Sequence, residues 1–270
     1  MRYAVISDIH SNIEALTETL KKIDSIGVDL ILSLGDIVGY NSNPNECVEL
    51  VRERNILSIA GNHDIRAAGQ KEPDDFNEAA KKALLWTREN LSLENTAFLK
   101  ELPESLSIAV PPRPTPLGVG TPKVGSGGIN GKFVLTHGAI NSPDIYTLSV
   151  IDAAINFSLM KKITPFLKGG LGGIKKGLPL TGFFGHTHIP IAYAGNPAGA
   201  EAITKKRFKL QEGCFYFINP GSVGQPRDRD ARASFLIFDA AKNEVSFYRV
   251  EYDIKACADK IKAAGLPGIL

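Results

Sequence analysis

The sequence is poor in cysteine and has no long hydrophobic run. Its three cysteines, Cys47, Cys214 and Cys257, are far apart, odd in number and without the close spacing of a zinc site. A disulfide-stapled secreted domain is therefore excluded, and we expect free thiols in a reducing cytoplasm. No apolar stretch approaches the roughly 20 residues that a membrane helix needs, so we also expect no membrane span.

Neither sign of charge dominates the chain. The 31 Lys and Arg residues nearly balance the 29 Asp and Glu residues, and the formal net charge is +2. This balance gives no electrostatic reason to bind nucleic acid, although a small local basic patch is compatible with it. We expect no cleavable signal at the N-terminus, because an expected strand at Tyr3–Ser7 begins almost at once and leads to Asp8.

Strand and helix patterns alternate in the first 60 residues. Short apolar runs predict buried strands at Tyr3–Ser7, Asp29–Leu34 and Ile56–Ala60. A capping box at Ser11 and Glu14 opens a helix after the first strand, and a second helix is expected at roughly Asn45–Arg54. Strands joined by helices predict a parallel sheet with right-handed crossovers.

The rest of the chain mixes helices with further strands. Helices are expected at Phe76–Asn90, from Ser92 onward, and from an Asp253 cap to Gly265. Strands are expected at Lys132–Thr136, Leu180–Phe184, Cys214–Ile218, Ala233–Phe238 and Glu244–Val250. The last third suggests a second sheet, mixed or antiparallel, packed against the first. Glycine-rich stretches near residues 111–131 and 161–177 are interpreted as irregular inserts in a single domain of residues 1–270.

All five histidines lie in short motifs that also contain Asp, Asn or Gly. The motifs are S-D-I-H with Asp8 and His10, G-D-I-V-G with Asp36, G-N-H-D with Asn62, His63 and Asp64, T-H-G with His137, and G-H-T-H with His186 and His188. Each follows an expected strand, and ligands bind at such strand ends in open α/β sheets. Residues i and i+2 of an extended segment point the same way, ~6.6 Å apart, so each D-x-H or H-x-H pair should converge. This pattern predicts a metal site.

The same spacing suits two metal ions ~3.5–4 Å apart. Asp36 can bridge them because a carboxylate has two oxygens, and Asn62 can supply a neutral oxygen. Imidazole, carboxylate and amide ligands together favour Mn, Fe or Zn over Mg or Ca. Two divalent ions, two aspartates and a bridging hydroxide would leave about one positive charge, which is complementary to a phosphodiester anion.

In this order the motifs resemble those of the calcineurin-like metallophosphoesterase superfamily, and within it the small prokaryotic phosphodiesterase group. The closest likeness lies in S-D-I-H-S-N-x-E-A-L, G-D-I-V-G-Y-x-x-x-P-N-E and I-N-P-G-S-V-G-Q-P-R-D. The resemblance implies a four-layer αββα sandwich of two packed mixed sheets flanked by helices. It assigns one metal ion to Asp8, His10, Asp36 and His188, and the other to Asp36, Asn62, His137 and His186.

Five further side chains have expected roles near these ions. His63 is left over when the other four histidines coordinate metal, so it is the candidate for stabilising the transition state and protonating the leaving oxygen. Asp64 either orients His63 or anchors its loop. Asn12 either contacts phosphate or caps a helix. Arg227 either binds phosphate or pairs with neighbouring aspartates. Arg66 likewise either binds phosphate or forms an ion pair within the protein.

The sequence therefore predicts a cytoplasmic phosphodiesterase with two divalent transition-metal ions, Mn being favoured. A metal-bridging hydroxide would attack in line, and His63 would assist the leaving group. The substrate would be a small phosphorylated molecule, with nucleotides among the options. The alternatives are a phosphomonoesterase, a dinucleoside-polyphosphate hydrolase, and a metal-bound binding or regulatory module with little turnover. A nuclease is disfavoured by the near-neutral charge.

Overall fold

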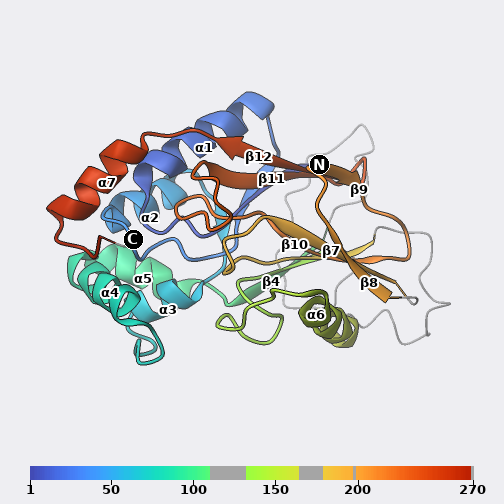
Figure 1. The fold of residues 1–270 in the computed structure, drawn as a ribbon, viewed down its shortest axis with the longest axis horizontal. Helices are drawn as coiled ribbons and strands as arrows, with labels where there is room; N and C mark the ends of the chain where they lie inside the picture. Colours follow the sequence, from blue (N-terminus) through green and yellow to red (C-terminus); the bar gives the residue numbers. More distant parts are fainter. Residues whose placement is uncertain (110–131, 164–178, 197–198, 269–270) are drawn as a thin grey trace.

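Two mixed β-sheets lie face to face in the computed structural model, which describes residues 1–109, 132–163, 179–196 and 199–268 (Figure 1). Helices cover the outer faces of the two sheets, so the predicted four-layer arrangement of two packed mixed sheets and flanking helices is confirmed. Apart from residues 161–163, which end a helix, the expected inserts near residues 111–131 and 161–177 lie outside the described residues.

The first sheet contains six strands within the described ranges, in the order β3-β2-β1-β11-β12-β9. Their bounds are β1 (Arg2–Ile6), β2 (Leu30–Ser33), β3 (Leu57–Ser58), β9 (Arg207–Lys209), β11 (Ala233–Asp239) and β12 (Glu244–Val250). The first three strands are parallel, as predicted. On the other side of β1 the neighbour is antiparallel β11, with Ala4 beside Ile237.

The expectation that the last third of the chain forms the second sheet is wrong for β11 and β12. Both faces of β11 are buried: Phe235 and Ile237 pack toward the helices, whereas Leu236 and Phe238 pack toward the other sheet. A strand that is apolar on both faces is stable only inside a sheet covered on both sides. This composition suits a central strand with a neighbour on each side, as β11 has in β1 and β12.

The second sheet has the order β4-β5-β6-β10-β7-β8 in the part of the chain that the structure describes. Its strands are β4 (Ser105–Ala109), β5 (Lys132–Thr136), β6 (Leu180–Phe183), β7 (Ile191–Asn196), β8 (Gly199–Ile203) and β10 (Phe215–Asn219). The central strands β5, β6 and β10 are parallel, and antiparallel pairs flank them. An aromatic core fills the space between the sheets, where the Tyr3 and Phe133 ring centroids lie 5.1 Å apart.

Three groups of helices complete the molecule. Their bounds are α1 (Ile13–Ile26), α2 (Pro44–Glu53), α3 (Asn62–Ala67), α4 (Glu78–Asn90), α5 (Leu93–Glu101), α6 (Val150–Ile163) and α7 (Ile254–Ala263). Helix α1 covers β11 and β12 and contacts α2 and α7, α6 covers the outer face of the second sheet, and α3, α4 and α5 pack together beside α2. No helix in the described ranges is long and apolar enough to cross a membrane.

Several helix predictions need correction. Asn12, not Ser11, caps α1: its Oδ1 accepts from the Ala15 N–H at 3.0 Å, whereas Ser11 has a left-handed φ of 57° that an N-cap does not adopt. Helix α4 begins after an Asn77 cap, so Phe76 precedes it. A short helix that the sequence did not predict, α3, begins within the G-N-H-D motif. The sequence did not predict helix α6. Its exposed side carries Ile151 and Ile155 and its buried side carries Ala153 and Phe157, so no alternation of apolar and polar faces marks it as a helix.

Candidate metal centre

Strand ends from both sheets bring the Asp- and His-containing motifs together. Asp8 follows β1 and Asp36 follows β2 in the first sheet, whereas His137 follows β5 and His186 follows β6 in the second. All four side chains are buried. A hydrogen bond joins the two sheets here, because the His186 backbone N–H donates to Asp8 Oδ1 at 3.1 Å. The site therefore lies where the two sheets meet.

The backbone turns sharply at these residues. Left-handed φ angles occur at Asp8 (54°), His10 (48°), Asp36 (53°), His186 (65°) and His188 (60°). The expectation that extended i, i+2 spacing aims these side chains is therefore wrong. Tight loops just beyond the strands aim them instead, and hydrogen bonds hold the loops together: the His10 N–H donates to Asp36 O at 2.9 Å. Asp and His tolerate this region better than most residues.

Four side chains form a first group of ligand atoms, all within 4.8 Å of one another: Asp8, His10, Asp36 and His188. The Nε2 atoms of His10 and His188 are 3.1 Å apart. His188 Nε2 is also 3.3 Å from Asp8 Oδ1, and His10 Nε2 is 3.5 Å from Asp36 Oδ2. These four residues are the set that the resemblance assigned to one ion.

The ring orientations in this group fit a bound cation. His10 Nδ1 lies 3.1 Å from the Val38 carbonyl oxygen, and His188 Nδ1 lies 2.6 Å from that of Gln225. A carbonyl accepts but cannot donate, so each Nδ1 carries the proton and each Nε2 presents a lone pair. Burial lowers the pKa of both rings, which keeps them neutral. Two lone pairs 3.1 Å apart repel unless a cation lies between them.

A second group shares Asp36 with the first. Asp36, His137 and His186 place their ligand atoms within 4.8 Å of one another. Asn62 Oδ1 lies 3.0 Å from His137 Nε2, and Asp36 Oδ2 lies 3.2 Å from the same nitrogen. His137 Nδ1 is oriented by the Leu34 carbonyl at 2.8 Å. Burial opposes protonation of His137, but the Asp36 carboxylate outweighs it and raises the pKa of His137 to about 9.

Among the described residues, two buried atoms of the second group form no hydrogen bond: Asp36 Oδ2, which faces His137 Nε2 at 3.2 Å, and His186 Nε2. Asp36 Oδ1, in contrast, accepts from the His63 backbone N–H at 2.8 Å. Buried polar atoms are nearly always paired, so these two atoms of ligand type fit a bound cation. Imidazole, carboxylate and amide donors together fit divalent transition-metal ions.

His63 lies beside the first group but belongs to neither group. Its ring centroid is 4.8 Å from that of His10, 4.5 Å from Tyr40 and 4.7 Å from Phe76. A Cβ atom at Gly39 would collide with the His63 ring, so only glycine fits there. Burial outweighs the nearby Asp36 carboxylate and lowers the pKa of His63 to about 4. The ring is therefore neutral at neutral pH and faces the same site.

Asp64 is engaged with the backbone. Its Oδ1 accepts from the N–H groups of Ile37 and Val38 at 2.9 and 3.1 Å, and its Oδ2 accepts from Gly61 at 2.9 Å. No hydrogen bond joins Asp64 to the His63 ring in the part of the chain that the structure describes. Of its two expected roles, this geometry favours the loop anchor.

Asn12 and Arg66 are engaged in contacts within the protein. The Asn12 side chain caps α1 and donates to the Gly224 carbonyl at 3.0 Å, so both of its polar groups are occupied. The fully buried Arg66 guanidinium donates to Asp144 at 2.8 Å and to Asp75 at 2.5 Å. Substrate contact by either residue is therefore not supported, because neither is among the described residues that line the cavity at the ligand groups.

Arg227 has a different environment from the one that its sequence neighbours suggested. Asp228 pairs with Arg249, and Asp230 pairs with Arg232, so the expected pairing of Arg227 with these aspartates is wrong. The exposed Arg227 donates instead to Tyr40 Oη at 3.3 Å and to Gln225 Oε1 at 2.9 Å. It lines the cavity above the ligand groups.

This cavity has a volume of about 160 Å³. Its lining joins ligand candidates to aromatic and charged side chains: Asp36, Tyr40, Asn62, His63, Asp75, Phe76, Asn77, Ala80, Asp144, Tyr146, His186, His188 and Arg227. Tyr40 and Tyr146 had no predicted role. The sequence offers one signal for Tyr40, which directly follows G-D-I-V-G, and none for Tyr146.

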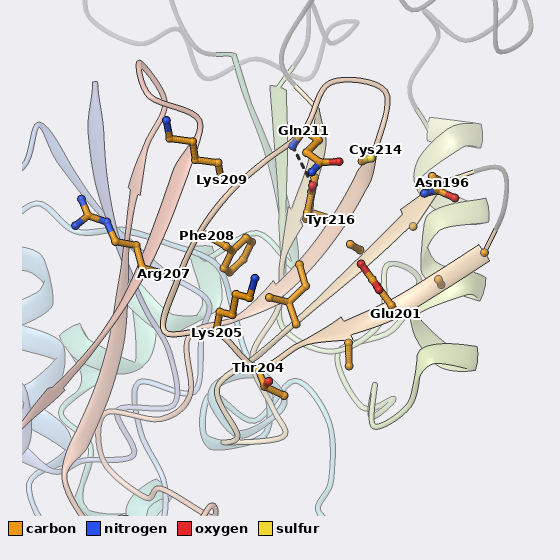
Figure 2. A pocket seen from close by; sticks show the side chains of 16 residues that line it. Asn196, Glu201, Thr204, Lys205, Arg207, Phe208, Lys209, Gln211, Cys214 and Tyr216 are labelled. Carbon is orange, nitrogen blue, oxygen red and sulfur yellow. Dashed lines mark hydrogen bonds between the residues drawn. The ribbon is translucent and has the colours of Figure 1, made fainter.

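A larger cavity of about 770 Å³ lies elsewhere, among the ends of β7 to β10. Figure 2 shows it between the strands that carry Glu201, Phe208 and Tyr216. Its described lining contains no histidine or aspartate, and the Tyr216 hydroxyl is occupied by the Gln211 N–H at 2.9 Å. Size alone would favour this cavity, but the histidine and aspartate side chains that form the two ligand groups lie at the smaller one.

Comparison with known proteins reveals relatives that match nearly the whole chain. Residues 1–211 match the family described as calcineurin-like phosphoesterase. An uncharacterized protein of Methanocaldococcus jannaschii is 36% identical over 267 residues, which are 98% of this chain and 93% of the relative. The crystal structure of a metallophosphoesterase from Sphaerobacter thermophilus is 34% identical, with a TM-score of 0.73 over 99% of this chain and 95% of that one.

A hypothetical protein from Pyrococcus horikoshii has a similar structure at 22% identity, with a TM-score of 0.70 over 98% of this chain and 94% of that one. At this identity the likeness concerns the fold alone.

Proposed function

The chain belongs to the calcineurin-like phosphoesterase family, and we propose that it is a two-metal phosphodiesterase for a small, nucleotide-like substrate acting in the cytoplasm. Family membership supports hydrolysis of a phosphate ester. One observation supports the finer proposal: two groups of buried ligand atoms share Asp36, and an uncoordinated histidine, His63, lines the same cavity.

Seven side chains would hold the ions. Asp8, His10, Asp36 and His188 would bind one ion, and Asp36, Asn62, His137 and His186 would bind the other. Divalent ions held there would activate water and neutralise charge on the phosphate. The donor set mixes imidazole nitrogen with carboxylate and amide oxygen, which fits Mn, Fe or Zn, and of these we propose Mn.

His63 would assist departure of the leaving oxygen. Burial keeps its ring neutral before substrate binds, and an anionic phosphate beside it would favour the protonated form. Such a ring can donate a hydrogen bond or a proton to the oxygen as its bond to phosphorus breaks. A site that only bound metal would not need this uncoordinated ring, which argues against a purely regulatory module.

The charges around the cavity favour a diester over a monoester. Among the described lining residues, Arg227 is the one cationic side chain, and no carboxylate pairs with it. A diester phosphate carries one negative charge, whereas a monoester phosphate carries about two near neutral pH. Two carboxylates, Asp75 and Asp144, line the same cavity and would repel the second negative charge of a monoester.

The test compares two chromogenic substrates, bis(p-nitrophenyl) phosphate and p-nitrophenyl phosphate. Metal-stripped protein is assayed alone and after addition of Mn²⁺, beside a His63→Asn variant. We expect Mn²⁺-dependent cleavage that favours the diester. In the variant, kcat should fall by ~10²–10⁴-fold while the number of bound ions, measured by elemental analysis, stays the same.

Other outcomes would redirect the proposal. Faster cleavage of the monoester would make the protein a phosphomonoesterase. Release of nucleotide from a dinucleoside polyphosphate, with neither chromogenic substrate cleaved, would identify a polyphosphate hydrolase. Bound metal without turnover of any of the three would favour a binding module. An unchanged kcat in His63→Asn would remove His63 from the mechanism.

A further inference from the structure

His186 differs from the other histidines of the two ligand groups in what orients its ring. His10, His137 and His188 each direct Nδ1 at a backbone carbonyl oxygen, at distances of 2.6–3.1 Å. No such bond orients His186 among the described residues, and its Nε2 is buried without a partner. A ring that ligates metal usually has a second contact that fixes its direction.

That contact is aromatic. The Tyr146 ring stacks on the His186 ring with centroids 3.9 Å apart and an interplanar angle of 24°. This is the shortest centroid separation of any ring pair found in the described residues. The His137 ring also lies next to His186, with centroids 5.1 Å apart and an interplanar angle of 62°. The two rings leave His186 little freedom to rotate.

Tyr146 is itself well anchored although it is 45% exposed. The carbonyl of the preceding residue, Ile145, accepts from the Ala139 N–H at 3.0 Å. Two residues before Tyr146, the Asp144 carboxylate accepts from Arg66 at 2.8 Å and from Lys71 at 2.9 Å. A fixed loop therefore presents Tyr146 to His186.

We propose that Tyr146 is a positioning residue for His186: its stacked ring replaces the missing hydrogen bond and holds the imidazole ready for the second metal ion. The inference rests on the proposed two-metal function. A bound cation draws electrons from the imidazole, and the electron-rich face of the phenol ring stabilises the resulting positive charge. The stack should therefore strengthen binding of the ion held by Asp36, Asn62, His137 and His186 and have little effect on the other ion.

The experiment measures metal binding rather than activity. Metal-stripped wild type, Tyr146→Ala and Tyr146→Phe are titrated with Mn²⁺ by calorimetry. Tyr146→Ala should bind the first ion normally and the second at least tenfold more weakly, as is typical when the outer partner of a ligand is lost. Tyr146→Phe keeps the ring and should match wild type. Electron paramagnetic resonance should show coupled Mn²⁺ pairs in wild type and Tyr146→Phe, and isolated ions in Tyr146→Ala at the same metal concentration.

Leu148→Ala is the matched control, because Leu148 is 62% exposed in the same loop and should leave both affinities unchanged. Circular dichroism checks that each variant is folded. If Tyr146→Ala is unfolded, Tyr146→Leu takes its place, because leucine keeps the apolar volume but has no aromatic face. Tyr146→Leu should also bind the second ion more weakly than wild type.

Three outcomes would overturn the inference. Wild-type affinity for both ions in Tyr146→Ala or Tyr146→Leu would show that the stack does not position His186. Loss of the second ion in Tyr146→Phe would assign the effect to the hydroxyl group instead of the ring. Failure of the wild type to bind a second ion would refute the proposed two-metal function itself, and so is distinguishable from the other two.

Discussion

Backbone strain at single residues prepares this site. Asp8, His10, Asp36, His186 and His188 all adopt left-handed backbone angles, which cost an L-residue about 1–2 kcal/mol each. Such strain persists only where the surroundings fix the conformation, and it is common at functional sites. Here hydrogen bonds between the strand-end loops fix it. The ligand atoms are therefore in place before an ion arrives.

Arg227 and Arg229 provide a matched test of phosphate binding. Both are exposed arginines two residues apart, but only Arg227 lines the cavity. We expect Arg227→Ala to raise KM for a diester by ~10-fold, because one charge-assisted hydrogen bond is lost. Steady-state kinetics should show no change in Arg229→Ala. Equal effects of the two substitutions would indicate general electrostatics and argue against a phosphate contact by Arg227.

The identities of the ligand candidates could be predicted from the sequence, but the roles of Arg66 and Arg227 could not. Asp and His residues in short motifs after strands seldom serve packing alone. They can therefore be recognised as candidate metal ligands without knowledge of the tertiary structure. The role of an arginine depends on its partners: Arg66 pairs with Asp144, 78 residues away, whereas the aspartates beside Arg227 pair with other arginines. No local pattern encodes the pairs Arg66–Asp144 and Asp228–Arg249, whose members are 78 and 21 residues apart.

At the level of elements, Arg66 connects helix α3 with two loops over the cavity. Its guanidinium donates to the Asn62 carbonyl within α3, and also to Asp75 and Asp144. It also lies 4.7 Å from the centroid of the Phe76 ring, which packs against His63. One buried side chain therefore holds the segments that carry Asn62, Phe76 and Tyr146.

Replacing Arg66 with Met should loosen all three segments. We expect a loss of about 3 kcal/mol in the free energy of unfolding, because several charge-assisted hydrogen bonds of a buried cation disappear. Urea denaturation measures this loss. The control is Arg54→Met, which breaks an exposed pair with Asp24 and should cost less than about 1 kcal/mol. Similar losses in the two variants would contradict a central role for Arg66.

The same network predicts a pH effect. Burial acts to raise the pKa of Asp144, but hydrogen bonds from Lys71 and Arg66 outweigh it and lower that pKa. The pKa of Asp144 in the folded state thus lies below the unfolded value of about 3.9. The ionised Asp144 carboxylate, bound to Arg66 and Lys71, therefore stabilises the fold above about pH 4, and this stabilisation is lost as the pH falls through the folded pKa. In Arg66→Met this acid-dependent part of the stability should shrink.

The elements themselves were predictable where their pattern was local. The parallel strands β1 to β3 and the Asp253 cap of α7 follow from short-range signals. The pairing of β1 with antiparallel β11 could not be predicted from the sequence. The two strands are more than 220 residues apart, and their pairing depends on how the apolar faces of the sheet are buried in the whole fold. Helix α6 was missed because exposed Ile151 and Ile155 hide its buried face.

At the level of the whole molecule, the candidate metal centre joins the two sheets. Asp8 and Asp36 extend from the first sheet, and His137 and His186 extend from the second. Without a cation, the facing nitrogens of His10 and His188 repel each other. Bound ions would remove this repulsion and link both halves of the sandwich through Asp36.

Metal removal should therefore lower the thermal stability of the whole fold. An ion that binds only the folded state at 100 times its Kd stabilises it by about 2.7 kcal/mol. For a chain of this size that corresponds to a Tm shift of roughly 5–10 °C. We expect chelator-treated protein to melt that much lower, as measured by scanning calorimetry, and Mn²⁺ to restore the Tm. An Asp36→Asn variant weakens both ion sites at once, so its Tm should respond little to Mn²⁺. If its Tm rose with Mn²⁺ as much as that of the wild type, the stabilising ions would be bound elsewhere on the molecule.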